Sequence, residues 1–241
     1  MRGMTEKPIL FSGPMVRAIL DGNKTQTRRI VKPQPPIDEI GRPEHGKILG
    51  PSMFEPVAYD RHGEMIPGPE IYGAFDDSGA WGVKYPSGQP GERLWVRETC
   101  WIWGRWFKNG KTLTGKQRWR FKADTPHGVH FKANHVQNAV KSTPRERRAY
   151  WKRPSIFMPR WACRLLLDVK SVRVERLNDI SVEDAIKEGI TYSTLDCPRM
   201  KFAQLWDSIN KERGDWQSNP WVWVVEFERV TYPAVQKKHC K

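Results

Sequence analysis

The chain has 241 residues, of which 38% are hydrophobic; this is enough for a proper core and excludes a disordered protein. Lys and Arg total 41 against 27 Asp and Glu, and the formal net charge of +14 favours a polyanionic partner over a solubilising basic surface, the alternative explanation. The apolar run Ile9–Phe11 is too short for a signal segment or a membrane span, so we expect a cytoplasmic protein with no membrane partner.

The N-terminal part predicts a strand, a short helix and a second strand. Ile9–Phe11 is the first strand, and Ser12-Gly13-Pro14 supplies a cap and a proline at the first helical position. Gly22 is a natural left-handed stop for the helix. The β-branched and basic stretch Thr25–Val31 then predicts a strand.

Two insertions interrupt the middle of the chain. From Lys32 to Gly91 the composition changes to proline, glycine and charge, which predicts a mostly irregular segment. A strand resumes at Glu92, where apolar and larger polar or aromatic residues alternate up to Cys100. The second insertion, about Trp101 to Trp151, mixes aromatic and cationic residues.

The C-terminal part predicts a bent strand and a capped helix. Apolar residues alternate from about Cys163 to Leu177, and the polar residues fall out of phase near Lys170-Ser171, where we expect a bend. Ser181 is the expected cap of a helix that ends at Gly189.

A further helix and a terminal strand follow. The helix is predicted from an apolar stripe at spacings of three and four, which ends before Gly214: Phe202, Leu205, Trp206 and Ile209. The strand has apolar residues on one face: Trp221, Trp223, Val225 and Phe227. Strands separated by short helices, without a regular βαβ rhythm, predict a mixed α+β domain.

Several segments resemble one known family, the ASCH domains. Gly22, Lys24 and Arg29 fit its signature G-x-K-x-x-x-x-R at a helix-to-strand junction, although a glutamate common before the final arginine is absent. Further segments resemble a longer branch found in phages and prophages: 90–99, 158–162, 184–190 and 219–223. The resemblance implies a PUA-like mixed β-barrel with short covering helices. It would be a single domain over 1–241 with insertions at about 32–91 and 101–151.

The resemblance also implies candidate catalytic residues. Some small ASCH proteins are metal-independent amidohydrolases that remove the acetyl group from N4-acetylcytidine by means of a lysine, a threonine and a glutamate. Lys24, Thr27 and Glu188 occupy the corresponding positions. Lys24 and Thr27 converge only if Lys24 lies in the turn after Gly22, because residues three apart in a strand face opposite sides. Lys24 also needs a pKa lowered by burial or by Arg28 and Arg29.

Other residues suit nucleic-acid contacts, with RNA favoured over DNA. Arg28 and Arg29 suit phosphate or base-edge contacts, and Arg160 with Trp161 pairs a guanidinium with a plane for stacking. In the second insertion Trp101, Trp103 and Trp106, interleaved with cations, resemble a stacking platform, although a Trp-x-Trp is equally the inward face of a strand. Core positions are favoured for the remaining tryptophans that follow a structural period: Trp95, Trp206, Trp221 and Trp223.

We expect no metal and no cofactor. The four cysteines lie far apart, with no C-x-x-C pair for a zinc knuckle: Cys100, Cys163, Cys197 and Cys240. One group of residues could be read as the ligands of a nuclease metal ion: Asp124, His127, His130 and His135. The segment that contains them lacks a helical period to fix their geometry, so we do not expect a metal there.

Three functions therefore compete at the sequence level. The first is a protein acting on RNA or modified nucleosides as an amidohydrolase of N4-acetylcytidine-like substrates. The second is a non-catalytic nucleic-acid binding protein, such as a modified-base reader or a phage factor. The third is a ribonuclease. Fold alone does not choose among them.

Overall fold

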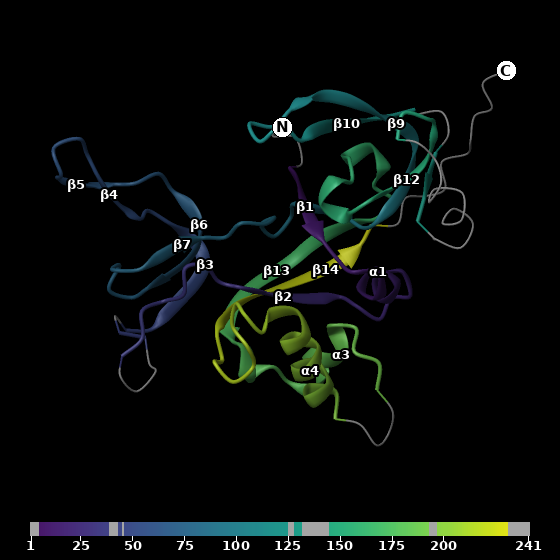
Figure 1. The fold of residues 1–241 in the computed structure, drawn as a ribbon. Coiled ribbons are helices and arrows are strands. Elements are labelled where there is room, and N and C mark those ends of the chain that lie inside the picture. Colours follow the sequence, from purple (N-terminus) through teal and green to yellow (C-terminus); the bar gives the residue numbers. More distant parts are fainter. Residues whose placement is uncertain are drawn as a thin grey trace. The chain divides into compact units, whose positions relative to one another are not determined.

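A computed structural model describes residues 5–38, 43–44, 46–124, 128–131, 145–192 and 197–230 (Figure 1). The chain divides into two compact units. The first unit comprises Met1–Lys7, Arg17–Leu94 and Leu166–Lys241, and the second comprises Pro8–Val16 and Trp95–Leu165. The expectation of a single domain over the whole chain stays a prediction.

A five-stranded sheet has the order β1-β8-β13-β14-β2. Its strands come from distant parts of the sequence: β1 (Glu6–Leu10), β8 (Arg93–Arg97), β13 (Leu166–Arg176), β14 (Trp221–Arg229) and β2 (Gln26–Ile30). The described strands do not close into a barrel, because β1 and β2 stand at the two ends of this order. The structure is mixed α+β and mostly strands, as the sequence predicts.

The longest strand of this sheet, β13, is bent. It pairs antiparallel with β14, and the register shifts between Val169 and Ser171. An extra residue at that point disrupts the ladder and bends the strand. The bend predicted near Lys170-Ser171 is therefore confirmed.

The helices of the described chain are short. They are α1 (Gly13–Leu20), α3 (Val182–Lys187) and α4 (Pro198–Asn210), and none of them is long and apolar enough to cross a membrane. The predicted cap of α3 is confirmed, because the Asp184 amide donates to Ser181 Oγ at 3.0 Å. Single 3₁₀ turns also occur: η3 (Ser155–Phe157), η4 (Arg160–Ala162) and η5 (Leu177–Asp179).

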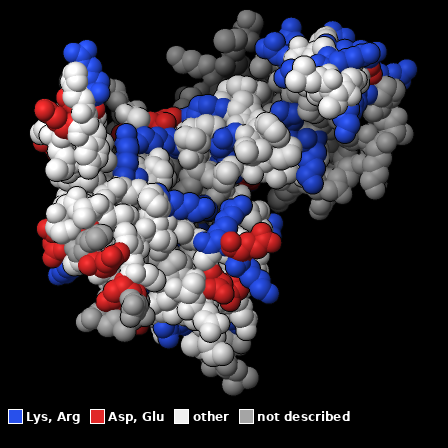
Figure 2. Space-filling view, turned by 60° about the vertical axis from the view of Figure 1, so that its left-hand side comes forward, with Lys and Arg blue, Asp and Glu red and all other residues white. Residues whose placement is uncertain are grey.

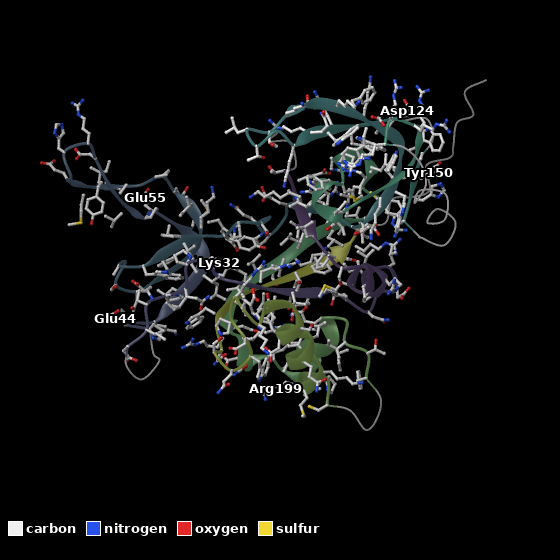
Figure 3. All side chains as sticks on the ribbon, viewed as in Figure 1. Lys32, Glu44, Glu55, Asp124, Tyr150 and Arg199 are labelled. Carbon is white, nitrogen blue, oxygen red and sulfur yellow. The ribbon has the colours of Figure 1, made fainter. Side chains whose placement is uncertain are left out.

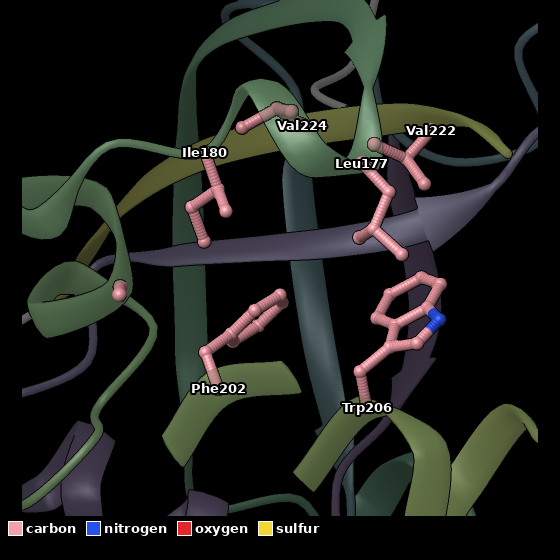
Figure 4. Close-up of a cluster of buried hydrophobic side chains, with 7 residues drawn as sticks. Leu177, Ile180, Phe202, Trp206, Val222 and Val224 are labelled. Carbon is pink, nitrogen blue, oxygen red and sulfur yellow. The ribbon is translucent and has the colours of Figure 1, made fainter. Parts of the chain in front are cut away.

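One hydrophobic core cluster of the first unit lies between α4 and the sheet (Figure 4). Phe202 and Trp206 of α4 pack with Val222 and Val224 of β14 and with residues around η5 and α3: Leu177, Ile180 and Ala185. The predicted apolar stripe of this helix is only half buried, since Leu205 and Ile209 are 37% and 50% exposed. Only residues one turn apart, at i and i+4, reach the sheet from this helix.

The first insertion is more regular than its composition predicts. A three-stranded sheet has the order β3-β6-β7, and β4 pairs with β5 as a hairpin. The strands are β3 (Ile48–Phe54), β6 (Ile71–Asp76), β7 (Gly82–Lys84), β4 (Val57–Tyr59) and β5 (Met65–Pro67). Most of the described residues of this insertion lie outside these strands, as expected, but the strands that do form include glycines. A Cβ on Gly73 would lie 2.0 Å from the Val83 carbonyl oxygen, so glycine permits the β6–β7 approach.

The second unit contains a sheet centred on one long strand, β9 (Cys100–Lys111). Three strands pair with it: β10 (Gln117–Ala123), β11 (Val129–His130) and β12 (Ala149–Arg153). A core cluster on one side of this sheet contains Cys100, Ile102, Met158 and Ala162. The second insertion therefore folds into a sheet of this unit.

Truncation in the α4 core tests this packing. Phe202→Ala is expected to lower the free energy of unfolding by about 3–5 kcal/mol, because a fully packed aromatic ring is lost and a cavity is left. Ile209→Ala, on the exposed side of the same helix, is the control and is expected to cost less than about 1 kcal/mol. Urea unfolding followed by tryptophan fluorescence measures both, and equal losses would contradict the assigned helix face.

Candidate active site around Lys24 and Glu188

Lys24 lies in a turn between α1 and β2, outside the regular ladder. The backbone turns back on α1 there, with the Lys24 amide donating to the Ala18 carbonyl at 3.1 Å. Gly22 has a φ of +79°, which allows the predicted helix stop. Lys24 then forms an isolated antiparallel bridge with Glu188, just beyond the end of α3. Lys24 therefore lies in the turn after Gly22, which is the position that its convergence with Thr27 requires.

The close approach of the two segments depends on Gly189. Its φ is +84°, and a Cβ at this position would lie 3.0 Å from the Cβ atoms of both Ala18 and Lys24. A side chain on residue 189 would therefore be crowded, and Ala18 or Lys24 would have to shift by a few tenths of an ångström. The glycine that ends α3 also brings Glu188 to the lysine.

A buried ion pair joins the two candidate residues. Lys24 Nζ lies 2.6 Å from Glu188 Oε2, and the exposed fractions of the two side chains are 0% and 5%. Nζ also donates to the backbone carbonyls of Gln26 and Glu188, both at 2.8 Å. All three donors of an ammonium group thus have acceptors.

Burial lowers the pKa of the Lys24 ammonium, because a charged group loses its hydration in the interior. The Glu188 carboxylate opposes this shift, whereas the positive charges of Arg29 and Arg28 add to it, and the net direction is downward. A lowered pKa is the condition that catalysis by this lysine requires.

Thr27 is buried on β2 but does not join the ion pair. It lies opposite Val225 of β14, and its hydroxyl makes no hydrogen bond to Lys24 or Glu188 among the described residues. Some buried side-chain atoms have no hydrogen-bond partner, and the Thr27 hydroxyl oxygen is not among them. The structure therefore brings Lys24 and Glu188 into contact, and leaves Thr27 close in sequence without a direct bond.

Arg28 lies in a carboxylate network instead of on the surface. Its side chain is fully buried, and Nη1 lies 3.3 Å from Glu188 Oε1. Nη2 lies 2.6 Å from Glu175 Oε1 and 2.9 Å from Asp184 Oδ2. The sequence assigns Arg28 to phosphate or base contacts, but in this arrangement the guanidinium binds the Glu188 oxygen that Lys24 does not.

The network extends across the sheet through Gln26, Arg173 and Glu226. Gln26 accepts from Arg28 Nη1 at 2.6 Å and donates to Asp184 and Glu226 at 3.2 and 3.0 Å. Arg173 forms ion pairs with Asp184 and Glu226 as well as with Glu175. Burial alone would raise the pKa of the Asp184 carboxyl, but the hydrogen bond from Arg28 and the charges of Arg173 and Arg28 hold it below its usual range.

Arg29 interacts electrostatically with both residues of the pair and with Tyr85. Arg29 is exposed as a residue, although burial of its guanidinium lowers the pKa of that group. Tyr85 follows β7 in the first insertion, and its ring lies 5.0 Å from that of Trp223 on β14. Burial raises the pKa of the Tyr85 phenol. The sequence does not reveal Tyr85, because a single tyrosine in a glycine- and proline-rich segment carries no sign of its contact with β14.

The other predicted contact residues belong to the second unit. Arg160 lies over the Trp95 ring, with Cζ 5.9 Å from its centroid, and Trp161 is exposed. Trp101 is buried, and Trp103 and Trp106 are half-buried on β9. Of the core tryptophans, Trp206 and Trp223 are buried as predicted, while Trp95 and Trp221 are half-buried.

The stretch considered for a metal site is described only in part. His127 and His135 lie outside the described residues, and Asp124 forms an ion pair with Arg148. No cluster of His, Cys, Asp and Glu suited to a metal ion occurs within the described ranges.

Comparison with known proteins gives no relative: no family model matches the chain, and neither does a curated protein or a solved structure. The ASCH resemblance rests on the sequence motifs alone. Any function of the Lys24–Glu188 pair must therefore be argued from its geometry.

Substitution of Gly189 tests how the pair is assembled. Gly63 has nearly the same φ, +83°, but open space around its Cβ position. Gly63→Ala is expected to cost about 1–2 kcal/mol for the left-handed backbone alone. Gly189→Ala is expected to cost at least about 1 kcal/mol more, from forced overpacking against Ala18 and Lys24. Thermal unfolding of the two variants gives the difference, and equal costs would refute the close approach.

The pH dependence of stability tests the carboxylate network. Asp184→Asn is expected to cost about 3 kcal/mol near neutral pH, because it breaks ion pairs with two arginines. A carboxyl whose folded pKa is depressed contributes stability above its unfolded pKa of about 3.9, and this contribution is lost as pH falls through the folded value. The difference from wild type should therefore shrink below about pH 4. Urea unfolding at a series of pH values measures it.

The control for this series is Glu212→Gln. Glu212 is exposed in the turn after α4, and its substitution is expected to change stability by less than about 0.5 kcal/mol at every pH. A constant deficit for Asp184→Asn down to pH values where the carboxyl is protonated would show that its charge is not what stabilises the network.

Proposed function

We propose that the Lys24–Glu188 pair is the proton-transfer centre of a metal-independent amidohydrolase that acts on N4-acetylcytidine-like modified nucleosides. The observation that carries this proposal is the 2.6 Å contact between Nζ and Oε2 at a lysine with no exposed side-chain surface. Movement of one proton over that distance converts the ion pair into a neutral amine and a carboxylic acid. Burial favours the neutral amine, because it penalises the charge of the Lys24 ammonium.

The reaction needs water, an acid and a base. Water adds to the acetyl carbonyl carbon, the tetrahedral intermediate loses the cytosine nitrogen, and that nitrogen takes a proton, so that cytidine and acetate are released. The Glu188 carboxylate, as the base, takes the proton that the attacking water gives up and then, as the acid, supplies it to the leaving nitrogen; Lys24 Nζ is the partner of that proton through its 2.6 Å contact with Oε2. Lys24 has no exposed surface, so its role is that of proton partner and not of attacking group.

Two further residues fit supporting roles. The Thr27 hydroxyl makes no hydrogen bond to Lys24 or Glu188 among the described residues, and in this proposal it orients the water or donates to the oxyanion. Arg28 holds the second oxygen of Glu188 and fixes the direction of the first. The ASCH resemblance, with its PUA-like fold, supplies the substrate class, and the ion pair supplies the chemistry.

A non-catalytic binding site is the second candidate. It is favoured by the three acceptors already bound to Nζ, since a fully satisfied ammonium is also what a purely structural clamp requires. In that case the pair would position β2 and α3 around a modified base without turnover. Ribonuclease activity, the third hypothesis, would appear as RNA cleavage that is insensitive to chelators and lost in Lys24→Ala.

Hydrolysis of N4-acetylcytidine and its deoxy form, followed by chromatography, decides between these functions. Wild type is expected to release cytidine. Lys24→Ala and Glu188→Gln are expected to lower the rate about 10²–10⁴-fold, the usual contribution of a positioned acid or base. Lys170→Ala, which removes an exposed lysine on β13, is the control and should keep the wild-type rate.

Folding of each variant must be checked by its unfolding transition, because a buried pair is broken. Glu188→Gln retains the volume of the side chain and an acceptor for Lys24, which makes it the more informative variant. No turnover by wild type, or full turnover by folded Glu188→Gln, would remove the amidohydrolase assignment.

A further inference from the structure

The positive charge of the chain is concentrated in one segment. Residues 100–153 carry 14 Lys and Arg against two acidic residues, Asp124 and Glu146, and so hold +12 of the net charge of +14. The rest of the chain is close to neutral. Figure 2 shows such a concentration of Lys and Arg at its upper right, in the part of the molecule where Figure 1 has β9 and β10.

The strands β9, β10, β11 and β12 contain no Asp or Glu. Each acid of the segment already has a cation, since Asp124 Oδ2 lies 2.6 Å from Arg148 Nε and Glu146 Oε1 lies 3.9 Å from Lys108 Nζ. The sheet therefore presents cations without intervening negative charge.

Strand register separates the two faces of this sheet, because paired residues of antiparallel strands point to the same side. On the inner face Trp106 contacts Phe121 and Trp151, and Arg153 lies over the Trp106 and Phe121 rings at 5.0 and 4.6 Å. This face continues into the core cluster around Ile102. Trp106, which the sequence places with the stacking residues, is therefore a packing residue.

The opposite face combines rings with cations. Trp103 pairs with Tyr150 across β9 and β12, and their rings lie 5.0 Å apart; Figure 3 labels Tyr150. Arg105 pairs with Lys122, and Phe107 pairs with Arg120, across β9 and β10. We call these six residues the aromatic face: Trp103, Arg105, Phe107, Arg120, Lys122 and Tyr150.

Burial on the aromatic face is graded. Arg120 and Lys122 are exposed, whereas the three rings and Arg105 are half-buried. The rings are thus fixed by the sheet and keep part of their surface accessible. Lys152 and His130 extend the same face and are also exposed, while Trp101, which pairs with both, is buried.

We propose that the aromatic face binds a single-stranded nucleic acid, with bases stacked on Trp103, Phe107 and Tyr150 and phosphates held by Arg120 and Lys122. The charge selects a polyanion, since neutralised phosphates release counterions. The fixed rings select unpaired bases, because a base can stack on a side chain only when it has left its own helix. Stacking accepts any base sequence, so the proposed ligand is distinguished by being single-stranded and not by its sequence.

This site is separate from the proposed chemistry at Lys24. It rests on the second unit alone, whereas the Lys24–Glu188 pair belongs to the first. Either site can fail its test without affecting the other. The variants of the aromatic face should therefore hydrolyse free N4-acetylcytidine at the wild-type rate, if wild type hydrolyses it at all.

Binding of fluorescein-labelled 12-nucleotide RNA and DNA strands of one mixed sequence, measured by fluorescence anisotropy on the full chain, tests the proposal. Wild type is expected to bind at least one of the two strands and to bind the matching duplex at least about tenfold more weakly. Affinity should fall with salt, at a slope of about 0.7 per phosphate contact for a single strand.

Charge-reversal variants distinguish binding at the aromatic face from a general attraction of nucleic acid to the basic protein. The double variant Arg120→Glu/Lys122→Glu is expected to lose at least about tenfold in affinity and to show a smaller salt slope. Lys211→Glu/Arg213→Glu makes the same charge change at exposed residues of the first unit and should lose less than about threefold.

Substitution of Tyr150 tests stacking directly. Tyr150→Phe keeps the ring and should retain affinity, whereas Tyr150→Ala should weaken binding about 5- to 140-fold, which corresponds to ~1–3 kcal/mol for one stacked base. If Tyr150→Ala does not fold, the exposed charge pair still decides. The proposal is overturned if neither strand binds at low salt, if the duplex binds as tightly, or if both double variants lose affinity equally.

Discussion

The burial of Lys24 against Glu188 is the constraint on which the arrangement of the first unit depends. Moving an ammonium and a carboxylate out of water costs several kcal/mol for each, so both need a full set of partners. Lys24 obtains its partners from backbone carbonyls of two segments, and Glu188 obtains a second cation from Arg28. The end of α1, the start of β2 and the end of α3 must therefore meet at one point.

Stability alone does not explain such a pair, because well-packed apolar side chains in its place are often as stable or more so. An apolar replacement would lose two properties of the pair: the lowered pKa of Lys24 and the 2.6 Å distance from Nζ to Oε2, over which a proton can move. The surrounding carboxylates and arginines then act as a scaffold, since they fix Glu188 through Arg28 and tie Arg28 to Glu175 and Asp184. The second unit is strongly basic and does not contain this network, so the two units differ in their chemistry.

The sequence predicted the elements that depend on local signals. Ser181 and Gly189 delimit α3 as expected, and the polar residues at Lys170-Ser171 mark the bend of β13, because caps and pleat phase are properties of neighbouring residues. The family resemblance named Lys24 and Glu188 as candidate catalytic residues, but it did not predict their ion pair. It is not a local property, because it joins residues 164 apart.

Other features lay beyond local patterns. Arg28 looks like a surface cation in the sequence, and only its carboxylate partners from β13 and α3 explain its burial. The first insertion was expected to be irregular because its glycines and prolines normally end strands, yet some of them lie within strands. Which tryptophan of β9 faces outward depends on register with β10 and β12, which a Trp-x-Trp spacing leaves open.

The most direct test of the central claim is the titration of Lys24 itself, by NMR of the ¹⁵N-labelled ε-amino group, assigned from the signal missing in Lys24→Met. The structure predicts that Lys24 titrates below its ordinary value of 10.5. It also predicts a still lower value in Glu188→Gln, because the Glu188 carboxylate raises the pKa in wild type. Titration at or above 10.5 in wild type would mean a solvated or purely paired lysine, and would contradict the account.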